Sequence, residues 1–342
     1  MSERRTFEFL NVMRFVSALW VVLSHLGAPP LDSLASGTNA ELIRKALIAP
    51  FSGVAAVMVF FVISGFCIHY AHMVGTRFDV VSFYLRRFTR IGLPLLMAVA
   101  LHQWWGTERW LKNVLWSVYC ELIYYAAYPA LRMAMARVGA LPVAIIALAI
   151  SWLFCLQSDE GFGHITAYGN AWTWLVCLPT WLGGCALAEW VAGVRVEPCY
   201  ARSVSGWTER HLVMARWAVW AASSILLILG MKEILPFKYS LPVFGLFMVP
   251  WFMAEMRRPD VITWMGKLGA GGYSIYLMHS VSQPQEGRHL FDSLHPLLGW
   301  ILRMMVAAIV SAAFYMVVER PSHMLARLLG GWWRKKSIST EP

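Results

Sequence analysis

An arginine and a histidine lie eleven residues apart in the first apolar stretch of the chain, residues 7–27. An α-helix turns about 100° per residue, so eleven residues make three turns plus about 20°. Arg14 and His25 are therefore expected on one helix face, about 16 Å apart along the axis. Ionisable groups inside a membrane span cost roughly 2.5–3.5 kcal/mol each on insertion scales, so they indicate function by default. The alternative is that Arg14 extends to one interface and His25 lies unused at the other.

Two more titratable groups are expected at the depth of His25. Glu121 lies about two turns from the outer end of the apolar stretch 114–135, and His279 lies near the outer end of the stretch 268–283. A carboxylate beside an imidazole fixes its tautomer and raises its basicity, which is the usual arrangement of a general base. We therefore expect the three groups to converge in space. The alternative is that they are three unrelated interface residues.

Three arginines precede the apolar stretch 91–105, at positions 86, 87 and 90. Arg87 and Arg90 are three residues apart, so they share a helix face. A pair of guanidinium groups can bind phosphates bidentately, which makes Arg87 and Arg90 candidates for a phosphate-bearing ligand. The alternative is that they are positive charges that anchor a helix end on the cytoplasmic side.

The composition indicates that these groups lie in a membrane protein. Of the 342 residues, 58% are hydrophobic and 14% are charged, whereas a soluble domain averages about 45–50% and about 25%. This balance indicates a polytopic membrane protein and excludes a disordered chain or a small disulfide scaffold. The six cysteines form no CxxC pair and no Cys/His ligand pattern, so we expect no metal site.

We expect an all-α fold of about ten transmembrane helices, each needing about 20 mostly apolar residues. Two stretches, 91–105 and 268–283, are near or below that length and are included because the charge distribution requires them. The remaining eight are residues 7–27, 51–71, 114–135, 141–157, 171–192, 212–231, 239–256 and 297–319.

The basic residues predict the orientation of these helices. With the N-terminus in the cytoplasm, 20 of the 29 lysines and arginines fall inside and 8 outside, as the positive-inside rule requires. Both termini are then cytoplasmic, and the net charge of +10 reflects topology, with no nucleic-acid partner expected. Residues 1–333 are predicted to form one transmembrane domain in the lipid bilayer, and residues 334–342 a short polar cytoplasmic tail.

Six sequence blocks occur in an order that resembles the membrane acyltransferase 3 family, the bacterial integral-membrane acyltransferases that O-acetylate surface glycans. The chain differs from the family at Asn11, where the family often has Asp, and it lacks a fused SGNH domain, so it resembles the stand-alone form. The blocks are Arg14 with His25 (Arg-x10-His), Phe60–Phe66 (FFVxSGF), Arg86, Arg87, Arg90 and Pro94 (RRxxRIxP), Trp116, Ser117, Glu121, Tyr125 and Pro129 (WSLxxExxFYxxxP), Tyr273–His279 (YSIYLWH) and Glu319–Pro321 (ExP).

The resemblance implies a multi-pass protein of the bacterial inner (plasma) membrane that transfers an acyl group, expected to be acetyl, from cytoplasmic acetyl-CoA or another acyl-CoA. The implied acceptor is a hydroxyl of a glycan, such as lipopolysaccharide O-antigen or an exopolysaccharide. His25 would deprotonate this hydroxyl, Glu121 would orient His25, and Arg14 and Ser64 would line the acyl path. The donor would be bound by Arg86, Arg87 and Arg90, and the substrates would contact Trp116, Tyr125, Tyr273 and His279.

The sequence leaves two questions open. Direct transfer and transfer through a briefly acylated His25 or Ser64 are both compatible with these residues. A transporter or flippase of a lipid-linked glycan is the alternative function, although no paired halves with broken helices are visible in the sequence. A non-catalytic membrane scaffold would leave Arg14, His25 and Glu121 without a role.

Overall fold

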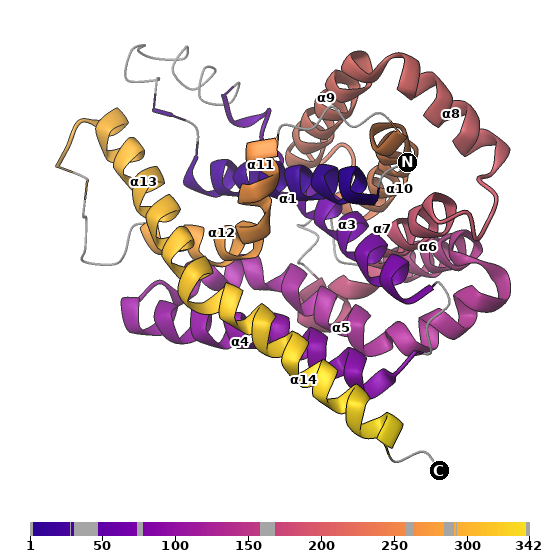
Figure 1. Cartoon of the computed structure of the whole chain (residues 1–342). Helices are drawn as coiled ribbons and strands as arrows, with labels where there is room; N and C mark the ends of the chain where they lie inside the picture. The colour runs from indigo at the N-terminus through magenta and orange to yellow at the C-terminus, as the bar shows by residue number, and fades with distance from the viewer. Residues whose placement is uncertain are drawn as a thin grey trace. The chain divides into compact units, whose positions relative to one another are not determined.

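The computed structural model describes residues 3–27, 29–30, 47–73, 78–157, 168–257, 263–283, 291 and 293–339. Within these residues the chain is helical and contains no strand (Figure 1). The α-helices are α1 (Glu3–Leu26), α3 (Gly53–Met73), α4 (Val80–Trp105), α5 (Glu108–Val138), α6 (Ala140–Gln157), α7 (Gly169–Val191), α8 (Cys199–Arg210), α9 (Leu212–Met231), α10 (Phe237–Arg257), α11 (Thr263–Leu268), α12 (Gly272–Met278), α13 (Pro296–Phe314) and α14 (Arg320–Ser339).

Seven helical segments of the described chain are long and apolar enough to cross a membrane. The helices α4 and α5 have the necessary length, but their polar and charged residues keep them out of this set. The chain is thus a multi-pass membrane protein, while the total of ten crossings and the side of each terminus stay predictions. The seven are Glu8–Leu26, Gly53–Met73, Ala140–Gln157, Ala171–Val191, Leu212–Met231, Phe237–Arg257 and Pro296–Lys336.

The predicted span 268–283 is not a continuous α-helix. It consists of the end of α11, a 3₁₀ turn η3 (Gly269–Gly271), α12 and a second 3₁₀ turn η4 (His279–Ser282). Glycine is about 1 kcal/mol less favourable than alanine in a helix interior, so the glycine run weakens the helix here. Gly269 is also required sterically, because a Cβ there would lie 1.8 Å from the carbonyl oxygen of Asn11.

The chain forms two compact units. Unit 1 comprises Met1–Val21, Ile48–Gly75 and Trp116–Ala270, and unit 2 comprises Val22–Leu47, Thr76–Leu115 and Gly271–Pro342. The long helices α1 and α5 each contribute residues to both units. His25, His279 and the three arginines of α4 belong to unit 2, whereas Arg14, Ser64 and Glu121 belong to unit 1.

In unit 1, α3 packs most extensively on α7. Glycines on both helices allow the close approach: a Cβ at Gly65 would lie 1.9 Å from the carbonyl oxygen of Trp181, and one at Gly184 would lie 2.1 Å from that of Val62. Gly65 is the glycine of the Phe60–Phe66 block, so this block holds α3 against α7 and fixes the position of Ser64.

In unit 2, α4 lies side by side with α14 (Figure 1). A π-helical turn η5 (Tyr315–Glu319) joins α13 directly to α14. Such turns occur frequently at functional sites, because the extra residue changes which side chains face the neighbouring helix. α14 continues through Arg334 as far as Ser339, so the described part of the predicted tail is helical, and the division into a domain and a tail stays a prediction.

Candidate active site

His25 and His279 form a direct pair in unit 2. The Nδ1 atom of His25 lies 2.9 Å from the Nε2 atom of His279, and the two ring planes differ by only 6°. His25 lies at the end of α1 and is exposed, whereas His279 follows α12 and is completely buried. The sequence predicted that the two histidines would lie at one depth, and the structure brings them into contact.

The backbone of α12 sets the tautomer of this pair. The Nδ1 atom of His279 lies 2.8 Å from the carbonyl oxygen of Tyr276, and a carbonyl oxygen only accepts hydrogen bonds, so Nδ1 carries a hydrogen. In the neutral ring Nε2 is then the acceptor, and His25 donates to it through Nδ1–H. The Nε2 atom of His25 therefore carries the lone pair, as a general base requires.

Neighbouring groups hold both partners of the pair. Gln283 donates from its side-chain amide to the carbonyl oxygen of His25, in the last turn of α1, at 2.7 Å. The hydroxyl of Tyr276 donates to the carbonyl oxygen of Val114 at 2.8 Å. His102 lies 3.1 Å from the carbonyl oxygen of Leu277 and is itself bonded to Thr107 at 2.7 Å. These bonds anchor α12 to α4 and to the start of α5.

Ser64, Glu121 and Tyr125 form a second cluster, in unit 1. The Oε1 atom of Glu121 accepts hydrogen bonds from the hydroxyl of Ser64, at 2.6 Å, and from the hydroxyl of Tyr125. The indole N–H of Trp181 donates to the Ser64 oxygen at 3.3 Å. The hydroxyl of Ser64 is therefore close enough to the carboxylate of Glu121 to transfer its proton to it, as an activated nucleophile requires.

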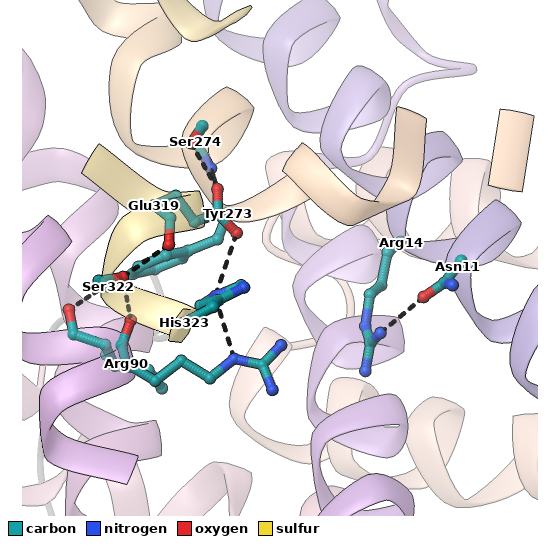
Figure 2. Close-up of polar contacts among 9 residues, drawn as sticks. Asn11, Arg14, Arg90, Tyr273, Ser274, Glu319, Ser322 and His323 are labelled. Carbon is teal, nitrogen blue, oxygen red and sulfur yellow. Dashed lines mark hydrogen bonds and ion pairs between the residues drawn. The ribbon is translucent and has the colours of Figure 1, made fainter. Parts of the chain in front are cut away.

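Arg14 lies next to this cluster along α3. Its guanidinium donates to the side-chain oxygen of Asn11 at 2.8 Å and to the sulfur of Cys67 at 3.0 Å (Figure 2 shows the bond to Asn11). Cys67 and Ser64 are three residues apart on α3, which places them about 4.5 Å apart along the axis of one helix face. Asn11 supplies the oxygen that Asp would supply in the family, but not its charge.

The three predicted donor-binding arginines differ in their surroundings, all within unit 2. Arg86 turns onto its own helix and donates to the hydroxyl of Ser82 at 2.7 Å, while its side chain fills the space left by Gly330 of α14. Partial burial, with the nearby charges of Arg334 and Arg87, lowers the pKa of Arg86.

The other two arginines are better placed for a ligand. Arg87 is partly exposed and makes no hydrogen bond or ion pair with any residue that the structure describes. Arg90 is exposed and donates from Nε to the Nε2 atom of His323 at 3.1 Å. The geometry therefore favours Arg87 and Arg90 over Arg86 as a phosphate site.

The predicted site residues divide between the two units. The structure brings His25 to His279 in unit 2, and Ser64 to Glu121 and Tyr125 in unit 1. The expected contact of Glu121 with His25 would join the two units, so it stays a prediction. Among the predicted substrate-binding residues, Trp116 packs on Phe61 in unit 1, and the hydroxyl of Tyr273 donates to the carbonyl oxygen of Ile91 at 3.3 Å in unit 2.

Several polar neighbours were not predicted from the sequence. Trp181, Cys67, Gln283 and His323 each contact a predicted site residue, but none belongs to a block that the resemblance assigned to the site. These contacts depend on how the helices pack against one another, so the sequence alone carries no signal for them. Within the described residues, no group of three or more His, Cys, Asp or Glu side chains could hold a metal ion.

An apolar cavity of about 350 Å³ lies in unit 1 among α1, α3, α9 and α10. It is lined on α1 by Val12, Met13, Val16 and Trp20. Arg14 and the other predicted site residues do not line it, so this cavity is separate from the polar clusters.

The seven apolar helices define a multi-pass membrane protein. The histidine pair gives it a site that can transfer a proton. A family model described as an acyltransferase domain matches residues 7–318. The chain thus belongs to the acyltransferase 3 family and is a membrane acyltransferase. Comparison with curated proteins and with solved structures gives no match.

Proposed function

We propose that this membrane acyltransferase moves an acetyl group from cytoplasmic acetyl-CoA to a hydroxyl of a glycan, such as an O-antigen or exopolysaccharide chain, in the bacterial inner membrane. The observation that carries the proposal is the histidine pair, in which the exposed His25 has its lone pair on Nε2 because the buried His279 engages its Nδ1–H. Membership of the family supports the transfer of an acyl group. That the donor is acetyl-CoA and the acceptor a glycan is our proposal.

His25 acts as the general base of the reaction. Its Nε2 takes the proton of the acceptor hydroxyl while the hydroxyl oxygen attacks the thioester carbonyl. A C–O bond forms, the C–S bond breaks, and the CoA thiolate takes the proton back from His25. The pair with His279 disperses the positive charge that His25 carries in between, since the Nδ1–H bond shortens and strengthens when the donor is charged.

Arg87 and Arg90 bind the phosphates of the donor. Both groups lie on α4, one turn apart, and are accessible, as a ligand that arrives from the aqueous phase requires. With the N-terminus in the cytoplasm, this end of α4 faces the acyl-CoA pool. Arg14 of unit 1 is the cation proposed for the developing negative charge, and its guanidinium is half-buried.

Ser64 and Glu121 suggest the route of transfer through a covalent intermediate. The Ser64 hydroxyl already gives its hydrogen bond to the carboxylate at 2.6 Å, so Glu121 can accept the proton when the serine oxygen attacks the thioester. The acetyl group would then pass from Ser64 to the acceptor hydroxyl. In direct transfer the same hydroxyl would remain a spectator held by Glu121.

The alternative function is a transporter of a lipid-linked glycan. One observation favours it: the segment from α11 to η4 is a discontinuous helix, which transporters use at substrate sites. A transporter, however, consumes no thioester, so a single assay separates the two functions.

The assay uses membranes from cells with and without the chain, incubated with acetyl-CoA that is radiolabelled in the acetyl group. We expect label in the glycan fraction and release of free CoA only when the chain is present. Mass spectrometry of surface glycans from the same two cell lines should show the added acetyl mass and identify the acceptor. Membranes that contain the folded chain but release no CoA above background would contradict the proposal.

A further inference from the structure

The first turn of α14 contacts Arg90 at two points. Its Nε atom donates to the Nε2 atom of His323 at 3.1 Å, and its carbonyl oxygen lies 3.5 Å from the hydroxyl of Ser322. All three residues belong to unit 2. Since Arg90 is exposed, its flexible side chain would otherwise sample many rotamers.

A buried carboxylate lies behind His323. The Oε1 atom of Glu319 is 3.6 Å from the Nε2 atom of His323, and the Glu319 side chain is only 3% exposed (Figure 2). Because Nε2 accepts the hydrogen bond from Arg90, the neutral His323 ring has its hydrogen on Nδ1. The negative charge of Glu319 lies 3.6 Å from this same Nε2 atom, and its field attracts the guanidinium of Arg90 toward His323.

The π-helical turn η5 provides this arrangement. It ends at Glu319, and His323 follows four residues later, on the same face of α14. The hydroxyl of Ser322 donates to the carbonyl oxygen of Glu319 at 2.7 Å, which fixes the turn between them. Glu319 and His323 are thus held next to each other, and His323 contacts Arg90.

We propose that His323, backed by Glu319, is a positioning residue that orients the guanidinium of Arg90 toward the phosphate of the acyl donor. This inference rests on the donor-binding role proposed for Arg90. The bond uses the Nε–H of Arg90, and a phosphate bound end-on through the two Nη atoms does not compete with it. A guanidinium held in advance loses less side-chain entropy when the donor binds.

Glu319 has a second contact that separates its role from that of His323. Its Oε2 atom accepts hydrogen bonds from the backbone N–H of Ser274, at 2.9 Å, and from the Ser274 hydroxyl. Ser274 lies in the first turn of α12, and His279 directly follows that helix. We therefore expect His323 to act on donor binding through Arg90, whereas Glu319 acts on donor binding and also on the position of the histidine pair.

The test is a double-mutant cycle on the full chain in detergent or nanodiscs, with acetyl-CoA as the varied substrate. His323→Leu removes the acceptor for Arg90 and should raise the KM for acetyl-CoA about tenfold with kcat nearly unchanged, as expected for lost ground-state binding. His323→Gln keeps an acceptor near the position of Nε2 and should restore most of the affinity. In an Arg90→Ala background, His323→Leu should have no further effect, because its action passes through Arg90.

A control variant distinguishes the loss of the Arg90–His323 hydrogen bond from a general loss of packing. Glu319→Gln should raise the KM and also lower kcat, since it disturbs α12 as well. Equal KM values for wild type and His323→Leu, or an undiminished effect of His323→Leu in the Arg90→Ala background, would overturn the inference. Failure of the wild-type chain to turn over or bind acetyl-CoA would instead contradict the proposed function, so the two failures are distinguishable.

Discussion

The imidazole of His279 accepts a hydrogen bond from the imidazole of His25 across 2.9 Å, with its other nitrogen held by the carbonyl oxygen of Tyr276. A buried, backbone-anchored ring thus determines which nitrogen of an exposed ring can take a proton. In many hydrolases and transferases a carboxylate orients the histidine base. Here, the partner that lies in contact with His25 is a second histidine.

Replacement of His279 should lower the rate of the chemical step. His279→Leu keeps the approximate size of the buried side chain but removes the acceptor for the Nδ1–H of His25, so His25 can adopt the unproductive tautomer. We expect kcat to fall by at least about tenfold, with the KM for acetyl-CoA unchanged. Steady-state kinetics in nanodiscs measure both values. His279→Gln retains an acceptor and should be less impaired, and equal losses in the two variants would contradict the tautomer argument.

Glu121 can be tested for the importance of its charge. Glu121→Gln keeps an oxygen that can accept from Ser64 and Tyr125 but cannot take up a proton. If Ser64 becomes acylated, this variant should lose roughly 10²-fold in kcat, because general base catalysis contributes about 10²–10⁴-fold. Rapid quenching followed by mass spectrometry should detect acetylated Ser64 in the wild type and not in the variant. A fully active Glu121→Gln variant would show that the charge is not used.

Arg87 and Arg90 should contribute to donor affinity. Arg87→Ala and Arg90→Ala remove charge-assisted bonds to phosphate, so we expect the KM for acetyl-CoA to rise about tenfold or more for each, with a weaker dependence on ionic strength. Arg137→Ala, an exposed arginine in the last turn of α5 in unit 1, is the matched control for net charge. The assignment fails if Arg137→Ala changes the KM as much as the two α4 variants do.

Gly65 should be required for stability. A Cβ at this position would lie 1.9 Å from the carbonyl oxygen of Trp181, so Gly65→Ala must push α3 away from α7. We expect a loss of about 1–3 kcal/mol, the usual cost of overpacking, measured as a lower apparent Tm in detergent. The control is Gly206→Ala in α8, where a Cβ meets nothing within 4 Å. This variant should be neutral or slightly more stable because alanine favours the helix.

Much of the fold was predictable because membrane spans are long, apolar and continuous. The stretches 51–71 and 141–157 correspond to α3 and α6 within a few residues. The stretch 268–283 does not form one helix, because apolar content does not reveal that Gly269 must approach the backbone of Asn11. That contact depends on the packing of distant segments, which composition and periodicity do not encode.

The sequence indicates candidate site residues but not which of them form pairs. Helix periodicity places Arg14 and His25 on one face, and the depth of His279 in its stretch agrees with its contact to His25. The expectation that Glu121 orients His25 stays a prediction, and within unit 1 the contacts of Glu121 are Ser64 and Tyr125. Which of several polar groups at one depth meet is decided by helix rotation and crossing, for example by the glycine contacts of α3 and α7. His323 had no signal, because it lies outside every motif.

The central claim is that His25 is the general base of acyl transfer. The most direct test compares wild type, His25→Ala and the control His211→Ala, an exposed histidine between α8 and α9, at equal amounts of folded protein in the membrane. The measured quantity is the rate of transfer of radiolabelled acetyl from acetyl-CoA to the glycan fraction. We predict that His25→Ala abolishes transfer while acetyl-CoA binding persists, and that His211→Ala transfers at the wild-type rate. Transfer by His25→Ala at the wild-type rate would contradict the account.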